Sequence, residues 1–424
     1  MIARVFNRLS LAGLCATLVG NGLGRFAFVA MMPALIQAGW FNKAQASTLG
    51  VATLVGYVLG AAMAHSLASR WASAWLLRWS MLVCSLSFLA CAVEDAGMAW
   101  NLAWRTAAGA CGAILMVLPA PLILPRHDAA IRARASGVVF SGIGLGAAMS
   151  GLLVPLLVAG FGAAAAVHAA GPQAPPNGVT GAWLGLGAVC LALTAVAWRA
   201  WPAETVAPPG PAETSGLPDG IRLTVALVLL AHGLNAVGYL AHTLFLPDYV
   251  VRELRMPLAM GGFFWSMFGL GAALGPMLAG TLADAFGLKR CLLAGFALKA
   301  LSAILPAWGG GTAALLVSSI LMGICTPGIV VLVSAYTLER VGPLHHRRAW
   351  GLATSSFAIA QAAGGALMAF AATRLDSYQP LFCASAVALV GSVACIALIV
   401  ERAAPAPTPS GSRLLPVVIT APHP

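Results

Sequence analysis

The chain has 424 residues, of which 60% are hydrophobic and only 8% are charged, whereas a soluble domain carries about 25% charged residues. A chain this apolar cannot cover a globular surface with polar groups, so its composition excludes a soluble protein and requires lipid as part of the solvent. The net charge of +11 would suggest nucleic acid in a soluble protein. Here the basic residues lie in short segments between apolar runs, so membrane topology explains them and no nucleic-acid partner is expected.

A membrane-spanning helix needs about 20 mostly apolar residues, and twelve segments meet that requirement. The first follows Arg4 and Arg8, as the apolar region of a signal peptide would. It runs on well beyond that region and contains Asn21 and Arg25, so we interpret it as a retained helix. In chain order, the predicted spans are 9–36, 46–67, 75–93, 99–124, 136–160, 180–200, 222–247, 258–282, 290–308, 311–337, 350–373 and 379–400.

A stretch rich in Pro, Ala, Gly and Glu separates the sixth predicted span from the seventh. We expect an N-terminal six-helix bundle over residues 1–201, a cytoplasmic linker over 202–221 and a C-terminal six-helix bundle over 222–402. The Pro-rich residues 403–424 are predicted to form a disordered cytoplasmic tail. The predicted fold class is all-α: a monomeric polytopic membrane protein with two bundles of six helices.

Lys and Arg are distributed unevenly between the two sides of these spans. With both termini in the cytoplasm, cytoplasmic segments hold sixteen of the 23 Lys and Arg residues, and external loops hold four. Because cytoplasmic loops are enriched in Lys and Arg, this bias predicts an even number of spans with both ends inside, and we expect a bacterial inner membrane. The three others, Arg25, Arg105 and Lys299, lie within predicted spans.

The two halves repeat at a constant offset of 214 residues. The matches fall in the first and seventh, fourth and tenth, and fifth and eleventh spans. Because each half has six spans, both halves should insert in the same orientation, with their pseudo-axis along the membrane normal. The matched pairs are Asn21 and Asn235, Gly24 and Gly238, Pro33 and Pro247, Gly109 and Gly323, Cys111 and Cys325, Ser141 and Ser355, and Gly151 and Gly365.

A charged turn follows the eighth predicted span, reading Gly280-Thr-Leu-Ala-Asp284-Ala-Phe-Gly287-Leu-Lys289-Arg290. Asp284 can accept hydrogen bonds from the N-terminus of a neighbouring helix, and Gly287 permits a tight turn. The segment resembles the G-x-L-A-D-x-x-G-x-[KR]-[KR] signature of the major facilitator superfamily, which implies that these five named residues have a gating role. The alternative is an ordinary charged loop.

Other segments extend this resemblance. Residues 105–109 (Arg-Thr-Ala-Ala-Gly) resemble the R-x-x-x-G element of the fourth helix in that superfamily. Segments 22–26 (Gly-Leu-Gly-Arg-Phe) and 243–247 (Thr-Leu-Phe-Leu-Pro) are similar to its YbfB/YjiJ-like branch. The resemblance implies a secondary active transporter that moves a small organic solute by alternating access, with spans one, four, seven and ten lining the cavity. The first-half copy of the charged turn has Ala64 in place of the acid. A gating contact built on this turn should therefore differ between the two halves.

Polar side chains in the first span are costly in lipid. An arginine near the middle of a span costs roughly 3 kcal/mol or more, and Arg25 occupies such a position, with Asn21 one turn before it. We favour a substrate-binding role in which Arg25 anchors a carboxylate or another anion. In the alternative, Arg25 pairs with helix carbonyls at a bend among the neighbouring glycines.

The seventh span carries His232, Asn235, Tyr239 and His242. At about 100° per residue these side chains fall within an arc of about 80°. The stripe predicts a cavity lining that contacts substrate, with interhelical hydrogen bonding as the alternative. His242 lies nearest the external end, where water could reach it.

Three further residues are candidates for substrate binding: Arg105, Thr326 and Gln361. The segment 326–328 (Thr-Pro-Gly) should interrupt its helix and free backbone groups for a ligand, whereas Gln361 could equally serve packing. Lys299 lies in the middle of the ninth span, and the sequence alone gives it no function. Its side chain could snorkel to the interface or pair with a carbonyl.

No carboxylate lies near the middle of a predicted span, which tilts the expected substrate towards organic anions. Proton coupling would then depend on His232 or His242, whose ordinary pKa permits titration. Asp248, at the outer end of the seventh span, is a weaker option.

The sequence contains none of the catalytic motifs that we sought. The nine cysteines show no metal-ligand spacing, and the chain has no G-x-S-x-G elbow and no P-loop. We therefore expect no catalytic residue, metal or cofactor. The expected partners are a small-molecule substrate and membrane lipid, with protons as a candidate coupling ion. The alternatives are a transporter-like membrane sensor or receptor and, less favoured, an intramembrane enzyme.

Overall fold

A computed structural model of the chain describes residues 7–168, 178–202, 219–309 and 311–399. Most of the predicted linker, 203–218, and the whole predicted tail, 403–424, lie outside these residues. In the described part, twelve helices are long and apolar enough to cross a membrane. The twelve predicted spans and the all-α class are therefore confirmed.

The first six spans are built from residues 8–198. Their elements are α2 (Arg8–Thr17), the π-helix η1 (Leu18–Leu23), α3 (Ala27–Gln37), α4 (Lys43–Ala68), α5 (Ser73–Ala90), η2 (Glu94–Ala96), α6 (Gly97–Val117), α7 (Pro119–Ile123), η3 (Leu124–Arg126), α8 (Ala129–His168) and α9 (Val179–Trp198).

The last six spans follow from residue 219. Their elements are α10 (Asp219–Gly238), α11 (Leu240–Asp248), the π-helix η4 (Tyr249–Glu253), α12 (Leu258–Phe286), α13 (Leu288–Ile304), η5 (Leu305–Trp308), α14 (Gly311–Arg374) and α15 (Gln379–Ala397). The long element α14 contains two spans, which meet at Gly342, where the backbone has a φ of +72°.

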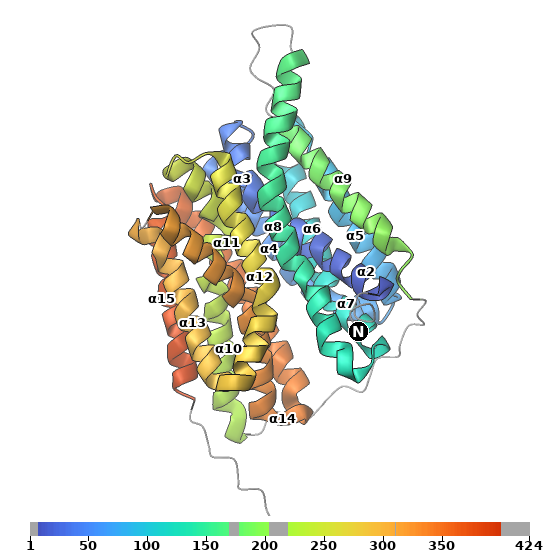
Figure 1. Ribbon diagram of the computed structural model, residues 1–424, viewed down its shortest axis with the longest axis vertical. Helices are drawn as coiled ribbons and strands as arrows, with labels where there is room; N and C mark the ends of the chain where they lie inside the picture. The colour runs from blue at the N-terminus through green and yellow to red at the C-terminus, as the bar shows by residue number, and fades with distance from the viewer. Residues whose placement is uncertain (1–6, 169–177, 203–218, 310, 400–424) are drawn as a thin grey trace, which may run out of the picture.

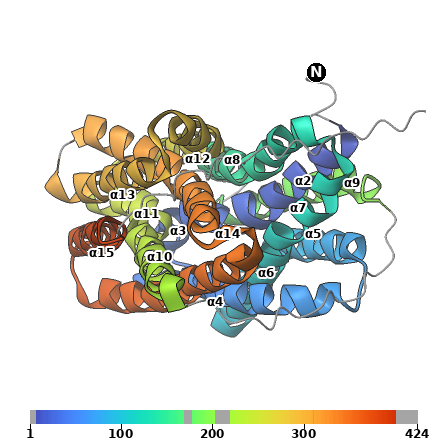
Figure 2. The same cartoon turned by 90° about the horizontal axis from the view of Figure 1, so that it is seen from below.

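The helices form two groups that lie side by side (Figure 2). Within the first group α4 packs on α6 and α5 on α9, and within the second α10 packs on α14 and α13 on α15. Two long contacts join the groups, α8 with α12 and the second span of α14 with α4. The first span is the most buried of the twelve, so it lies at the centre of the molecule.

The first and seventh spans are both broken at mid-length. The first changes from η1 to α3 across residues 24–26, and the seventh changes from α10 to α11 at Tyr239. The repeat offset of 214 residues relates Gly24 to Gly238 and Arg25 to Tyr239. The two helices are thus interrupted at equivalent positions, and polar residues occupy both breaks.

The contact between α8 and α12 is tight over part of its length only. A Cβ atom at Gly151 would overlap the carbonyl oxygen of Gly262, and one at Gly144 would overlap the backbone of Gly269 and its neighbours. A Cβ at Gly137, nearer the start of α8, would meet nothing within 4 Å. Small residues let the two backbones touch, and Figure 1 shows that the lower ends of these helices lie apart.

We call the end of the molecule that holds the turns 38–42, 254–257 and 375–378 the closed end. The opposite end, where the described chain begins and finishes, is the terminal end (Figure 1). At the closed end the Lys43 ammonium donates to the Leu375 carbonyl oxygen at 3.2 Å and lies 4.2 Å from the Tyr378 ring centroid. These contacts join the first group of helices to the second.

Candidate functional site

A polar contact crosses between the two groups at the helix breaks. The Arg25 guanidinium donates from Nη2 to the Tyr239 hydroxyl at 2.6 Å, and that hydroxyl donates to Oε1 of Gln361 at 2.5 Å. Arg25 and Tyr239 are themselves related by the repeat offset. The contact therefore joins equivalent positions of the two halves, and it lies where their pseudo-axis must pass.

Aromatic rings surround the Arg25 guanidinium. Its carbon Cζ lies 5.1 Å from the ring centroid of Phe26, 5.9 Å from that of Tyr57 and 5.8 Å from that of Tyr239, distances at which a cation is attracted to a ring face. Phe357 stacks on Tyr239 at 5.7 Å. Sequence reasoning missed Tyr57 and Phe357, although a tyrosine hydroxyl in the second span was a usable signal.

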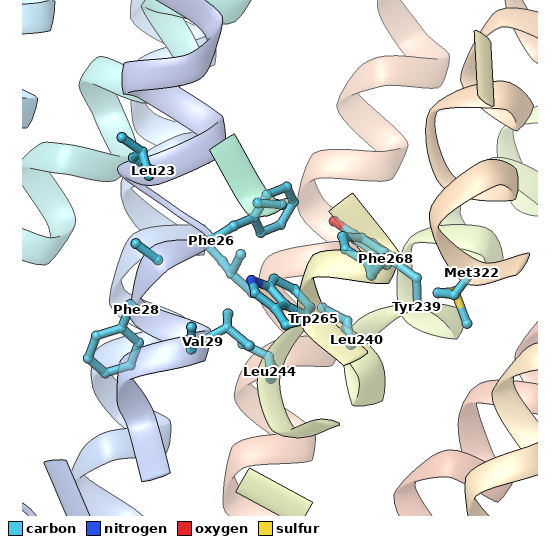
Figure 3. Packing of buried hydrophobic residues seen from close by; sticks show 14 of the residues in the cluster. Leu23, Phe26, Phe28, Val29, Tyr239, Leu240, Leu244, Trp265, Phe268 and Met322 are labelled. Atoms are coloured by element: carbon cyan, nitrogen blue, oxygen red, sulfur yellow. The ribbon is translucent and has the colours of Figure 1, made fainter. Parts of the chain in front are cut away.

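An aromatic cluster adjoins this contact on the side of α12 (Figure 3). Phe26 meets Trp265 edge-on at 5.6 Å and Phe268 at 5.9 Å, and the latter two rings stack at 4.7 Å. All three side chains are buried. Because Phe26 follows Arg25 directly, this apolar packing holds the first helix break against α12 and so positions the guanidinium.

Lys299 also approaches Tyr239. Its ammonium donates to Oδ1 of Asn235 at 2.8 Å and lies 5.0 Å from the Tyr239 ring centroid, and the side chain is fully buried. Lys299 does not snorkel; it pairs with a carbonyl oxygen, that of the Asn235 side-chain amide. Tyr239 therefore has one cation at its hydroxyl and a second over its ring.

Hydrogen-bond donors outnumber acceptors around Tyr239. Within the ranges that the structure describes, neither Arg25 nor Lys299 forms an ion pair; the pairs recorded there are Arg252 with Asp248 and Arg340 with Glu339. Gln361 Nε2 and Asn235 Nδ2 are buried and lack a hydrogen-bond partner in the same part of the chain. A buried unpaired donor is costly, so an acceptor-rich ligand fits here.

Arg105 lies elsewhere. Its guanidinium contacts Phe28 at 4.8 Å, and Phe28 packs against Trp183 of α9 at 6.4 Å. The side chain is 1% exposed, and Nε and Nη2 have no hydrogen-bond partner among the described residues. Arg105 thus sits inside the first group of helices, and its predicted contact with substrate stays a prediction.

Two predicted site residues make contacts between helices. Asn21 Nδ2 donates to the Gly112 carbonyl oxygen at 2.9 Å, so α6 is tied to η1. His242 Nε2 lies 2.6 Å from the Ser318 hydroxyl, and the side chain is fully buried. The expectation that water reaches His242 at the external end is therefore wrong, because Phe382 and α14 cover it.

His232 and Thr326 complete the predicted set. The His232 ring packs against Phe357 at 4.8 Å and Trp350 at 5.9 Å. Thr326 donates from its hydroxyl to the Met322 carbonyl oxygen at 2.7 Å, within an α14 helix that continues through residues 326–328. The expected interruption at this Thr-Pro-Gly segment is thus wrong. The proline lacks a backbone N–H donor, but the helix on both sides continues through it.

The closed end holds the acid next to the seventh span. The buried Asp248 carboxylate accepts from Arg252 at 2.5 and 2.6 Å and from the Tyr378 hydroxyl at 2.6 Å. Glu253 accepts from the Tyr378 amide at 2.8 Å. These bonds fix Tyr378 in place, so its ring is held as a platform for Lys43.

The charged turn after α12 lies at the terminal end. Gly287 has a φ of +86°, a left-handed value that favours glycine, and no atom lies within 4 Å of a Cβ built at Gly280. Lys289 donates to the Ile399 carbonyl oxygen at 2.7 Å, which ties the turn to the end of α15. Asp284 and Arg290 are exposed. The gating role of these residues stays a prediction.

Twelve spans in two packed groups, with a partly buried polar contact where the repeated helices meet, define a multi-pass membrane transporter. The family model described as "Uncharacterised MFS-type transporter YbfB" matches residues 17–397. The chain belongs to this family of the major facilitator superfamily, as its sequence motifs indicated. No curated protein shows a significant match to it.

Solved structures of transporters share the fold. The nucleoside transporter NupG is similar with a TM-score of 0.67 and 16% identity over 92% of this chain and 98% of that one; a point mutant of NupG gives 0.72 and 14% over 92% and 99%. A bacterial homolog of the human lysosomal transporter Spinster, inward-facing and unoccupied, gives 0.63 and 17% over 92% and 93%. At these identities the similarity shows the fold alone.

Proposed function

We propose that this transporter carries a small organic anion and that Arg25, Tyr239 and Gln361 form the centre of its binding site. The observation that carries the proposal is the chain of hydrogen bonds from Arg25 through Tyr239 to Gln361, with donors left over and no ion pair to an acid of the described residues. An arginine beside an amide N–H is a good receptor for a carboxylate, which accepts two parallel bonds. The rings of Tyr57 and Phe357 would pack against the organic part.

We propose that transport proceeds by alternating access between the two groups of helices. The two groups touch along α8 and α12 and at the closed end, while the charged turn at the terminal end is exposed. The excess of Lys and Arg on the side of the termini supports placing that side in the cytoplasm of a bacterial inner membrane. The conformation would then be closed to the outside and would release substrate inwards.

Coupling to protons would use His232 or His242, since the acids of the described spans lie at span ends. Both rings are buried beside the seventh helix, and each leaves Nδ1 without a hydrogen-bond partner among the described residues. Uptake into proteoliposomes with an imposed pH gradient tests this coupling. Equal rates with and without the gradient contradict it.

The substrate class is tested with purified protein. Monocarboxylates, dicarboxylates, nucleosides and quaternary ammonium ions are screened by thermal shift, where a ligand at 100 times its Kd stabilises by about 2.7 kcal/mol. Each hit is then assayed by counterflow in proteoliposomes. We expect saturable flux of carboxylates; flux of only neutral or cationic solutes overturns the anion proposal. Binding without flux would indicate a sensor instead.

A further inference from the structure

A ladder of exposed tryptophans lies at the terminal end, on the turn before α5 and on the first turns of that helix. Trp71, Trp75 and Trp79 are spaced by four residues and are 51%, 42% and 45% exposed. Their ring centroids are 4.9 and 5.9 Å apart, and Trp79 meets Trp198 of α9 edge-on at 6.3 Å. Trp75 and Trp79 lie one turn apart on α5, about 6 Å along its axis at about 1.5 Å per residue, and Trp71 lies in the turn just before the helix.

A groove lies beside this ladder. It has a volume of about 340 Å³ and is lined by Leu82, Leu191, Thr194, Ala195, Trp198 and Arg199. The Thr194 hydroxyl is turned to a buried partner, Ser85, at 3.2 Å, so the wall of the groove is mainly apolar. Arg199 is exposed and follows the last residue of α9, which places its charge at the end of a membrane-spanning helix.

The position of Arg199 is fixed by a neighbour. Arg78 of α5 donates from Nε to the Trp198 carbonyl oxygen at 2.8 Å and from Nη2 to the Trp201 carbonyl oxygen at 3.4 Å. These bonds hold the end of α9 against α5. Arg78 thereby donates hydrogen bonds to carbonyl groups that have no partner within the helix at its C-terminal end. The Arg199 side chain is therefore not needed to cap the helix.

The ladder belongs to one half of the molecule only. The repeat offset of 214 residues relates Trp71, Trp75 and Trp79 to Ala285, Lys289 and Leu293. Membrane proteins commonly carry tryptophans at the interface with water, and such a general belt would be expected on both halves. The ladder is therefore a feature of the first half and is not part of the repeat.

We infer that the groove between α5 and α9 binds an anionic phospholipid, with an acyl chain along the groove and the phosphate on Arg199. Two features favour this ligand. The guanidinium at the helix end complements a phosphate, to which arginine donates two parallel hydrogen bonds. The groove opens outwards from a membrane span and its wall is mainly apolar, so an acyl chain can enter it from the bilayer.

The test is native mass spectrometry of the full chain in detergent, titrated with dioleoyl phosphatidylglycerol or dioleoyl phosphatidylcholine. Both headgroups carry a phosphate, but choline offsets its charge in the second lipid, so we expect the net anionic first lipid to bind about tenfold more tightly. Arg199→Gln should abolish this preference, and Ala195→Phe, which fills the groove, should weaken both lipids about tenfold. Arg374→Gln, an exposed arginine at the closed end, is the charge-matched control and should change nothing.

Three results would overturn the inference. Equal affinity of the original chain for the two lipids would mean non-specific annular lipid. A preference that survives Arg199→Gln, or that Arg374→Gln removes to the same extent, would show that Arg199 does not hold the phosphate. Unchanged binding in the Ala195→Phe variant would place the acyl chain outside the groove.

Discussion

Arg25 is the residue on which the binding site depends. It stands at a helix break, its guanidinium reaches across to Tyr239, and no carboxylate of the described chain neutralises it. A charged group at this depth is tolerated when it faces a partner or a water-accessible site. The structure gives Arg25 a neutral partner, so its charge is left for a ligand.

We expect Arg25→Ala to abolish transport and to leave membrane insertion intact, because the anionic group of the substrate loses its charged partner.

Tyr239→Phe keeps the ring and removes only the hydroxyl, so we expect an affinity loss of about tenfold, corresponding to roughly 1.4 kcal/mol. Counterflow rates and the yield of protein in the membrane check both. Normal transport by the Arg25→Ala variant, or its failure to insert, would disprove the anchoring role.

At the scale of elements, the tight part of the α8–α12 contact decides how closely the two groups approach. Glycines on both helices let the backbones touch, and Ser266 donates from its hydroxyl to the Ala148 carbonyl oxygen across the contact at 2.9 Å. A larger residue can be accepted only if the helices separate. This contact therefore favours the conformation in which the closed end is shut.

Gly151→Leu should destabilise that conformation by about 1–3 kcal/mol, the usual cost of overpacking, since a Cβ there overlaps Gly262. We expect a lower midpoint of thermal unfolding and loss of transport. Gly160→Leu is the matched control, because it lies on the same helix with no atom within 4 Å of its Cβ position. If both variants behave alike, close backbone contact at Gly151 is not the cause.

At the scale of the whole molecule, the two ends differ in how they are held. The closed end combines the bond from Lys43 to Leu375 with the Tyr378 platform that Asp248 and Glu253 fix in place. The terminal end leaves Asp284 exposed, and no atom lies within 4 Å of a Cβ built at Gly137 of α8. Opening the closed end requires the contacts of Lys43 to break.

Lys43→Gln should shift the equilibrium towards opening of the closed end. It removes a cation over a ring and a charge-assisted hydrogen bond, together about 1–2 kcal/mol, which is a roughly 5–30-fold change in population. The distance between spin labels at the exposed positions Thr48 and Thr373 measures the shift and should increase. An unchanged distance distribution would show that Lys43 does not hold the closed end shut. Arg374→Gln is again the control and should leave the distance unchanged.

Asp284→Asn should slow the conformational cycle more than it weakens binding. The carboxylate is exposed here, so its charge can find a helix N-terminus only when the terminal end closes. We expect a reduced maximal flux with little change in the substrate concentration at half-maximal flux. Asp95→Asn, an exposed acid at the closed end, should leave both unchanged, and unaltered turnover in the Asp284 variant would refute the role.

Much of this architecture could be predicted because lipid imposes strict rules. Backbone groups in a bilayer must bond within their own helix, so apolar length alone predicts the twelve spans, and the repeat offset predicts that Arg25 and Tyr239 are equivalent. The sequence also showed that Arg25, Asn235 and Tyr239 could not face the acyl chains, and all three are directed to partners inside the protein.

Tertiary structure decided which partner each polar group has. Lys299 binds Asn235, His242 binds Ser318 and Arg105 packs on Phe28, and no spacing along the chain gives those pairs, because each joins different helices. Helical periodicity fixes the angle of a side chain around its own axis. Which neighbour lies at that angle depends on how the helices pack, and that is set by the sum of contacts over the whole molecule.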